Sequence, residues 1–375
     1  MPFIFPVSWL PAFNSLFLFV NTLLLCPELF ASEGGIPRIL RLYLRALCEG
    51  TAAMPDGRVF LAVLNDKTFP APVLARYTNH RLGRTAACGR GKLRFSLAAL
   101  WFGTRCQRIV CGHVRQLFLA RLVKFFRPSL EYYLVAHGIE VWRPFSPLER
   151  LALRGAKRIF CVSDYTRREM VKNCPGLRAE QLAVLPNALD PAFPIAALSP
   201  RPDGHVIFTL TRLDSAETYK GVDQLITALP LIRRELPGAR LRIGGTGDDL
   251  PRLKALVQTQ DLANAVEFLG FVSESQLTPE FQASNLFALP SGKEGFGLVF
   301  LEAMAHGKPC VGARAGGVPE VITDDCGLLV ESGDGPGLAA ACLAALRRHW
   351  KVNAILDRAR YFSYDNFRTR LAALW

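Results

Sequence analysis

Two strand–turn–helix units follow each other within residues 286–320, and this stretch constrains the fold more than any other. The apolar runs Leu286–Leu289 and Pro309–Gly312 predict two buried strands. Each is followed by glycines and then by a predicted helix, the first at Leu298–Ala305 and the second beginning at Pro319. Such units are typical of a parallel sheet whose carboxyl edge gathers helix N-termini, where free backbone N–H groups suit a phosphate. Any parallel sheet needs glycine turns, so a purely structural explanation of the glycines stays open.

A carboxylate within the first of these helices points to a ligand. The predicted helix is apolar on nearly all sides, so Glu302 should be buried. Burial of an unpaired carboxylate is costly, and a pair of ligand hydroxyls, such as those of a ribose, would satisfy it. A buried arginine is the alternative partner. Glu294 lies in the loop before the helix and is expected to face the same cleft.

Both glutamates stand in the segment EGFGLVFLEAMAHGKPCVGARAGGVPEVI, which resembles the signature of the family 4 retaining glycosyltransferases with the GT-B fold. The resemblance is most specific over residues 206–330. It implies an α/β protein of two Rossmann-like domains, whose parallel sheets face each other across a deep cleft. In that family the first glutamate, here Glu294, contacts hydroxyls of the donor sugar, and the second, here Glu302, holds the nucleotide ribose. The resemblance further implies that the donor diphosphate is bound by backbone amides at Gly295, Phe296, Gly297 and Leu298.

The N-terminal half carries two further segments that are expected to meet the donor. Gly34 and Gly35 precede a stretch with helical apolar spacing, and they resemble the family's glycine loop beside the donor phosphates and the acceptor. His137 follows a predicted strand at Glu131–Ala136, at the sheet edge where ligands bind. A histidine there can donate to a phosphate or a sugar hydroxyl, or it can be structural. The resemblance implies that His137 faces the donor sugar.

In the C-terminal half, two cations flank the turn after the first predicted strand. Arg212 follows the strand Val206–Thr211, and Lys220 precedes the predicted helix Val222–Glu235. They can converge on one diphosphate, whose negative charge grows as the glycosidic bond breaks, or they can be ordinary surface charges. Within the segment TRLDSAETYKG they resemble the family's phosphate-binding arginine and lysine. Val272 is expected to meet the nucleotide base through its backbone.

Length and composition agree with two domains, since 375 residues with 50% hydrophobic content can fill two cores. The first strand is predicted at Leu16–Val20, after an extension at residues 1–14 that the resemblance does not explain. Composition and the resemblance together predict four segments, namely an N-terminal acceptor-side domain at 1–187, a proline-rich linker at 188–204, a nucleotide-sugar-binding domain at 205–355, and a C-terminal helix at 356–375 that crosses back to the first domain.

The formal net charge of +13 suits an acidic partner. Twelve lysines and arginines, and no acidic residue, lie from Arg76 to Arg127, interleaved with six phenylalanine and tryptophan residues. This pattern in residues 76–127 is typical of a surface that meets an anionic membrane, and a solvated basic face is the alternative. No nucleic-acid-binding motif is present, so we expect no nucleic acid as a partner. The interleaved aromatic residues are Phe95, Trp101, Phe102, Phe118, Phe125 and Phe126.

The ten cysteines are scattered, with no CxxC pair and no histidine cluster. They predict buried thiols in a reducing compartment, rather than a disulfide framework or a zinc site. No DxD motif is present, because Asp248-Asp249 and Asp324-Asp325 are adjacent pairs. We therefore expect neither a metal ion nor a resident cofactor.

These features predict a retaining, metal-independent hexosyltransferase that moves a sugar from a nucleoside-diphosphate sugar to a glycan, a lipid-linked acceptor or another hydroxyl. We expect it to act in cell-surface polysaccharide or glycolipid synthesis, in the cytoplasm and on the inner face of the membrane. Two alternatives stay open, namely a nucleotide-sugar epimerase with the same fold and a catalytically silent nucleotide-sugar-binding protein. The predicted catalytic residues are His137, Glu294, Arg212 and Lys220.

Overall fold

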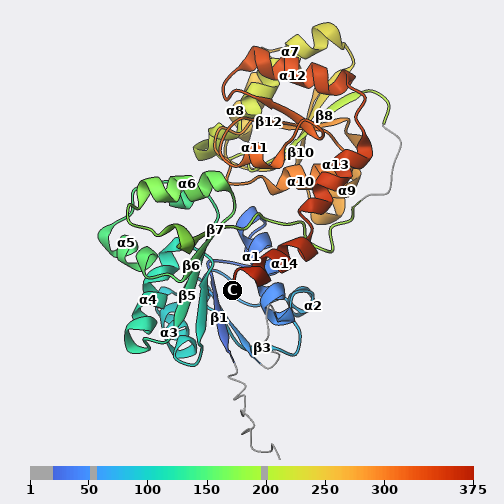
Figure 1. Ribbon diagram of the computed structural model, residues 1–375. Helices are drawn as coiled ribbons and strands as arrows, with labels where there is room; N and C mark the ends of the chain where they lie inside the picture. The colour runs from blue at the N-terminus through green and yellow to red at the C-terminus, as the bar shows by residue number, and fades with distance from the viewer. Residues whose placement is uncertain (1–19, 51–56, 196–201) are drawn as a thin grey trace, which may run out of the picture.

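The computed structural model describes residues 20–50, 57–195 and 202–375, which form two α/β domains, one above the other in Figure 1. The first domain holds a seven-stranded sheet in the order β3-β2-β1-β4-β5-β6-β7, and the second a six-stranded sheet in the order β10-β9-β8-β11-β12-β13. Every strand pair of the described residues is parallel. The prediction of two Rossmann-like domains with parallel sheets is confirmed.

The elements of the first domain alternate between strands and helices. Its strands are β1 (Thr22–Cys26), β2 (Val59–Val63), β3 (Leu82–Ala87), β4 (Arg108–Cys111), β5 (Glu131–Ala136), β6 (Arg158–Cys161) and β7 (Leu182–Val184). Its helices are α1 (Gly35–Glu49), α2 (Ala71–Ala75), α3 (Lys92–Gly103), α4 (Leu117–Phe126), α5 (Pro147–Arg154) and α6 (Asp164–Asn173), with short 3-10 turns at η1 (Val114–Gln116), η2 (Ile139–Val141) and η3 (Ala179–Gln181).

The second domain repeats the alternation and ends in three consecutive helices. Its strands are β8 (His205–Leu210), β9 (Ala239–Gly244), β10 (Val266–Gly270), β11 (Leu286–Leu289), β12 (Cys310–Ala313) and β13 (Gly327–Val330). The helices that follow the linker are η4 (Ser215–Lys220), α7 (Val222–Glu235), α8 (Leu250–Thr259), α9 (Glu274–Ala283), α10 (Leu298–Ala305), α11 (Val318–Val321), α12 (Gly335–Arg347), α13 (Val352–Tyr361) and α14 (Tyr364–Ala373).

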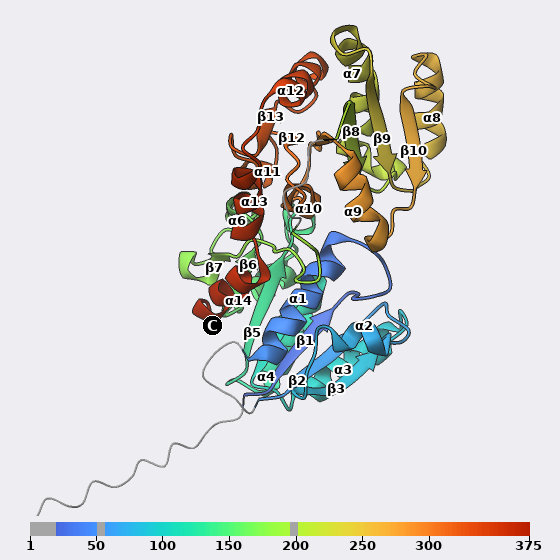
Figure 2. The same cartoon turned by 90° about the vertical axis from the view of Figure 1, so that its right-hand side faces the viewer.

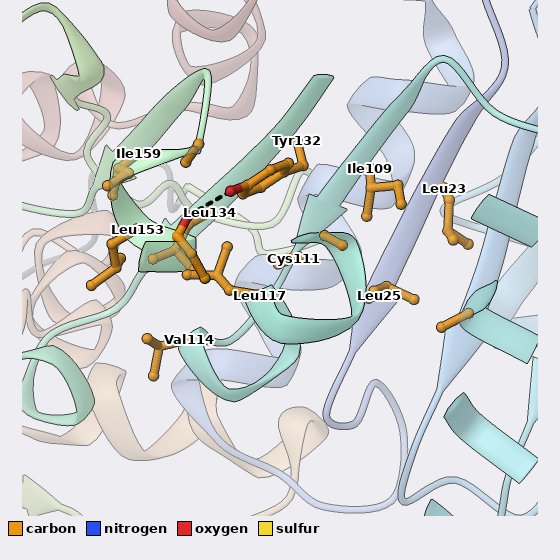
Figure 3. Packing of buried hydrophobic residues seen from close by; sticks show 14 of the residues in the cluster. Leu23, Leu25, Ile109, Cys111, Val114, Leu117, Tyr132, Leu134, Leu153 and Ile159 are labelled. Carbon is orange, nitrogen blue, oxygen red and sulfur yellow. Dashed lines mark hydrogen bonds between the residues drawn. The ribbon is translucent and has the colours of Figure 1, made fainter. Parts of the chain in front are cut away.

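The first sheet separates two apolar cores, because successive side chains of a strand point to opposite faces. Leu23 and Leu25 of β1 belong to the core beneath α3, α4 and α5, whereas Leu24 belongs to the core beneath α1. Figure 3 shows the first of these cores, in which the hydroxyl of Tyr132 donates to the carbonyl of Ala152 on α5 over 2.6 Å. Both sheet faces are therefore closed by helices, as a parallel sheet requires.

The first strand of the described residues begins six residues further along the chain than the predicted strand. Of the predicted strand Leu16–Val20, all but Val20 lies outside the described residues, and Val20 is not in a strand. The strand is Thr22–Cys26, which is hydrogen-bonded to β2 on one side and β4 on the other. Two apolar runs follow each other here, and burial between two neighbouring strands selects the second.

The last helix of the chain packs on the first domain rather than the second. In Figure 2, α14 and α1 lie on the same side of the first sheet. Phe367 of α14 is buried, and its ring lies 5.1 Å from that of Tyr43 on α1. The hydroxyl of Tyr364 donates to the Glu49 carboxylate over 2.8 Å. The C-terminal residue Trp375 adds an edge contact with the ring of Tyr133. The chain thus ties its two domains together through α14.

All ten cysteines lie among the described residues, and all are buried and free. The prediction of buried thiols without a disulfide framework is confirmed. Among the described residues, no helix is both long enough and apolar enough to cross a membrane.

Candidate functional site

The candidate site is built around the N-terminus of α10. Gly297 precedes this helix with a φ of 91°, in the left-handed region that favours glycine. No side chain caps the helix, and its first turn holds no acidic residue. Gly35, at the start of α1 in the other domain, lies so close that a Cβ on it would stand 3.7 Å from Leu298 Cδ1. Helix α1 is also uncapped. Two helix N-termini therefore lie next to each other with N–H groups free for an anion.

The loop before α10 touches the first domain through glycines. A Cβ on Gly138, whose φ is 140°, would lie 2.7 Å from Gly295 Cα, and a Cβ on Gly295 would lie 2.1 Å from the carbonyl oxygen of His137. No other residue fits at either position without moving one domain. Together with the approach of Gly35 to Leu298, this contact brings the loops that carry Gly34, Gly35 and His137 in the first domain to the segment of Gly295, Phe296, Gly297 and Leu298 in the second.

Lys220 and Glu294 form an ion pair at the same edge of the second sheet, with Nζ and Oε2 separated by 2.8 Å. Lys220 ends η4, and Glu294 lies between β11 and α10. Both side chains are largely buried, at 17% and 18% exposure. The structure therefore brings together the cation predicted for the diphosphate and the carboxylate predicted for the sugar, and the two groups neutralise each other.

Glu302 is buried, as predicted, and its carboxylate is paired with Arg38 of α1. Of the two partners considered from the sequence, the structure contains the arginine. The pair is not complete, because Oε2 of Glu302 is buried and has no hydrogen-bond partner among the described residues. Burial raises the pKa of Glu302, and the Arg38 guanidinium counteracts part of that rise. The Arg38 side chain is 23% exposed, so this ion pair has one edge open to water.

We expect Glu302→Gln to raise the melting temperature of the protein, measured without nucleotide at neutral pH. The folded-state pKa of Glu302 lies above its unfolded value, so burial of the charged carboxylate destabilises the fold above that pKa. Each pKa unit of upward shift corresponds to about 1.4 kcal/mol. As the pH falls through the raised pKa, the carboxyl binds a proton and the advantage of glutamine disappears. Calorimetric melting of both proteins over a series of pH values, from neutral downward, measures this, and an advantage that does not shrink as the pH falls would contradict it.

His137 is buried and offers one free acceptor atom. Its Nε2 lies 2.9 Å from the carbonyl oxygen of Gly112, which can only accept, so Nε2 carries the proton. Nδ1 is then an acceptor, and it is buried with no hydrogen-bond partner in the part of the chain that the structure describes. The sequence suggested that this histidine can donate or can be structural. In the neutral ring the free atom Nδ1 can only accept, for example from a sugar hydroxyl. Burial lowers the pKa of His137, and Glu140 and the Gly112 carbonyl counteract part of that effect.

If Nδ1 of His137 accepts from the donor sugar, kcat/KM should fall on the acid side and stay level above neutrality. Protonation of Nδ1 abolishes the acceptor, and because burial lowers the pKa, the midpoint should lie below the ordinary histidine value of about 6.5. Below the midpoint we expect roughly a tenfold fall per pH unit. His137→Asn should lower the activity and remove this limb, whereas His113→Asn, a control at a nearby histidine, should keep it. A midpoint above the ordinary histidine value would contradict the assignment.

Arg212 and Val272 lie less centrally than the other predicted residues. The Arg212 side chain is 68% exposed, and its guanidinium pairs with Glu217 of the same loop at 2.6 Å. Arg212 and Lys220 nevertheless line the same small surface hollow. Val272 follows β10 and packs beside Gly244 at the end of β9, where a Cβ on that glycine would lie 2.9 Å from Val272 Cγ2. Both residues therefore stand at the carboxyl edge of the second sheet.

The sequence did not identify two contacts between the domains. One is the contact of Glu302 with Arg38, because the sequence suggested an arginine partner but did not indicate which arginine. The other is made by Glu320, whose carboxylate accepts from the backbone N–H groups of Asp164 and Tyr165 at 2.7 and 2.9 Å. Glu320 thus caps helix α6 of the other domain. No pattern in the sequence indicates that Glu320 caps a helix more than 150 residues away.

The described residues include no group of three or more His, Cys, Asp or Glu side chains that could hold a metal ion. The positive charge at the site comes instead from Lys220, Arg212, Arg38 and the two helix N-termini.

Each domain matches a family model. Residues 42–193 match the model described as Glycosyltransferase Family 4, and residues 204–348 match Glycosyl transferases group 1. These ranges contain almost all of the candidate site, since only Gly34, Gly35 and Arg38 precede them.

Curated relatives include a GDP-mannose-dependent alpha-(1-6)-phosphatidylinositol monomannoside mannosyltransferase of Mycolicibacterium smegmatis. It is 29% identical over 302 residues, which are 74% of this chain and 75% of the relative. An N-acetyl-alpha-D-glucosaminyl L-malate synthase of Bacillus anthracis is 35% identical over 161 residues, 43% of this chain and 42% of the relative. The second alignment thus spans less than half of that relative's length.

Solved structures share the two-domain fold. The structure of Anabaena HepE in complex with UDP matches with a TM-score of 0.75 at 22% identity and covers 94% of this chain and 99% of that one. Sucrose-phosphate synthase from Thermosynechococcus elongatus matches with a TM-score of 0.70 at 19% identity, over 94% and 98% of the two chains. At these identities the similarity concerns the fold.

Proposed function

Because this chain belongs to the GT-B glycosyltransferases of family 4 and group 1, we propose that it transfers a hexose from a nucleoside-diphosphate sugar to a hydroxyl acceptor with retained configuration. The observation that carries the proposal is the set of groups at the α10 N-terminus. Lys220 pairs with Glu294 there, and the buried carboxylate of Glu302 keeps one oxygen without a partner in the same short helix. Cations, free N–H groups and buried acceptors together match a diphosphate, a sugar and a ribose.

The donor would replace the ion pairs of the site. Its diphosphate takes the place of Glu294 beside Lys220, with the free N–H groups of α10 as further donors. Glu294 is then released to accept from sugar hydroxyls. The ribose hydroxyls take the place of Arg38 on Glu302 and supply the partner that Oε2 lacks. After the exchange, Lys220 faces the diphosphate and each buried carboxylate accepts hydrogen bonds from hydroxyls of the donor, so neither carboxylate is left without a partner.

In the proposed reaction, the bond between the anomeric carbon and the β-phosphate oxygen breaks while the acceptor oxygen attacks on the same face. The acceptor proton passes to the leaving phosphate oxygen, and a nucleoside diphosphate is released. The negative charge that develops on the leaving group faces Lys220 and the α10 N-terminus, which stabilise it without a metal ion. Nδ1 of His137 accepts a hydrogen bond from a hydroxyl of the donor sugar and thereby orients the sugar.

The proposed acceptor is a glycan or a lipid-linked molecule, and the proposed place of action is the cytoplasmic face of a membrane. Ten free, buried thiols agree with a reducing compartment. The name of the mycobacterial relative describes transfer from GDP-mannose to a phosphatidylinositol mannoside. That relative supports a lipid-linked acceptor. It also makes GDP, together with UDP, one of the first two nucleotides to test.

Calorimetric titration with UDP, GDP, ADP and dTDP tests the donor class, followed by incubation with the matching nucleotide sugars and analysis of the products by NMR. We expect one nucleotide to bind and its sugar to be transferred with the anomeric configuration of the donor. If an epimeric sugar forms without acceptor, the protein is an epimerase and the proposed transfer is wrong. Binding without turnover across a panel of acceptors would make the protein a nucleotide-sugar-binding protein.

A further inference from the structure

The outer face of α3 and α4 exposes large apolar side chains. On α3, Leu93, Leu97 and Trp101 are spaced by four residues and share one helix face, with 75%, 59% and 41% of their surfaces exposed. On α4, Phe118, Phe125 and Phe126 are more than half exposed. A soluble monomer rarely gathers so many large apolar side chains on adjacent elements, and such a surface normally has a partner.

This face continues onto α5. Helix α4 packs against both α3 and α5, and the three helices form the left flank of the first domain in Figure 1. Leu148 and Leu151 on α5 are exposed by 64% and 53%. The exposed apolar side chains of α3, α4 and α5, with the cations among them, are called the α3–α5 face below.

The inner sides of the same helices belong to the core. Phe95 and Phe102 of α3 are buried beneath the α3–α5 face. Two of the six aromatic residues that the sequence suggested for a membrane surface are therefore core residues, while Leu93 and Leu97 join the surface instead. These helices therefore have two apolar sides. One packs on the sheet, and the other is not covered by any part of the described chain.

Cations surround the apolar side chains of the face. The indole ring of Trp101 contacts two guanidinium groups, those of Arg84 at 4.5 Å and Arg105 at 4.3 Å from the ring centroid. Lys92 and Arg94 are exposed beside Leu93 on the first turn of α3. No acidic residue occurs from residue 76 to residue 127. On α5, the carboxylate of Glu149 is already paired with Arg143.

We propose that the α3–α5 face docks on the surface of an anionic lipid bilayer. The leucine, phenylalanine and tryptophan side chains enter the boundary between headgroups and acyl chains, and the lysines and arginines meet the lipid phosphates. Trp101, which contacts two arginines, has the apolar body and polar surroundings that favour this boundary.

The charge of the face distinguishes a membrane from a second copy of the chain. A two-fold dimer through the α3–α5 face would place the same basic patch against itself, with no carboxylate from residues 76–127 to neutralise it. Anionic lipids supply that negative charge. The inference does not depend on glycosyl transfer, because docking can be measured without donor or acceptor.

The test is co-sedimentation of the full chain with vesicles of phosphatidylcholine alone and of phosphatidylcholine mixed with phosphatidylglycerol. We expect binding to the mixed vesicles, and a loss of roughly tenfold or more in partition with Phe125→Ser/Phe126→Ser. Lys92→Glu/Arg94→Glu should weaken binding to the mixed vesicles only. Tyr361→Ser, which replaces a half-exposed aromatic residue of α13, should bind like the unchanged protein. Thermal melting confirms that each variant is folded.

Two results would overturn the proposal. One is equal or absent binding of the unchanged protein to both kinds of vesicle. The other is a concentration-dependent dimer in sedimentation velocity that Phe125→Ser/Phe126→Ser dissolves, because the face would then be an interface between copies. Failure of nucleotide binding or turnover would leave vesicle binding as predicted, so the two proposals can fail separately.

Discussion

Replacement of Lys220 by alanine is expected to lower kcat by about a hundredfold to a thousandfold, the effect typical of removing one preorganised group that stabilises charge in the transition state. Lys220 ends η4, and Gly221 follows it with a φ of 74° in close contact with Pro290. This packing fixes the backbone that carries the ammonium group beside the loop of Glu294. The charge on the leaving diphosphate grows as the glycosidic bond breaks, so a fixed cation helps the transition state more than the bound donor.

The design separates the role of this cation from net charge and from folding. Lys254→Ala removes an exposed lysine of α8 and should leave kcat unchanged. Lys220→Arg keeps the positive charge and should recover part of the rate. Because Lys220→Ala also leaves Glu294 without its partner, nucleotide affinity is measured alongside kcat in the same proteins. A Lys220→Ala variant that turns over like the unchanged enzyme would remove Lys220 from the diphosphate site.

Replacement of Glu302 by alanine is expected to weaken nucleotide binding by about tenfold or more, which is about 1.4 kcal/mol or more. Two features suit this carboxylate to bind a pair of hydroxyls. Its Oε2 has no partner among the described residues, and its other contact, the partly exposed guanidinium of Arg38, can be displaced. Alanine removes both acceptors, and hydrogen bonds to a charged group contribute more than those to a neutral one. Calorimetric titration of the nucleotide that the unchanged protein prefers measures the effect.

Two further variants sharpen this result. Glu302→Gln keeps the volume and one acceptor, so its affinity should lie between those of the alanine variant and the unchanged protein. Glu331→Ala removes an ion-paired but exposed carboxylate of the same domain and should bind the nucleotide normally. If a folded Glu302→Ala protein binds the nucleotide with unchanged affinity, Arg38 is the only partner of this carboxylate and the ribose assignment is lost.

The centre of the site was readable from the chain because its physical causes are local. The apolar runs, the glycines between them and the apolar surroundings of Glu302 lie within 35 consecutive residues, and β11 and α10 have the predicted bounds Leu286–Leu289 and Leu298–Ala305. Burial of Glu302 follows from the helix in which it stands. Strand β12 begins one residue later than predicted, because its pairing with β13 starts at Cys310, and Pro309 has no N–H to donate to a neighbouring strand.

The first strand could not be read in the same way. The apolar residues up to Val20 and those of Thr22–Cys26 are equally suited to a strand by composition, and the choice depends on which of them lies between β2 and β4. Likewise, the aromatic residues from 76 to 127 divide between core and surface according to the helix face that meets the sheet. Phe95 and Phe102 face it, and Phe125 and Phe126 do not.

The sequence by itself determined two parallel-sheet domains, a phosphate-suited helix N-terminus and a buried carboxylate in the helix behind it, because periodicity and glycine placement act over a few residues. Only the tertiary structure decided the partners. Three features of the site depend on groups from distant parts of the chain, namely the pairing of Glu302 with Arg38, the cap that Glu320 provides for α6, and the hydrogen bond that leaves Nδ1 of His137 as an acceptor. Such contacts are set by how the two domains meet, and no local pattern encodes the distance between side chains that only folding brings together.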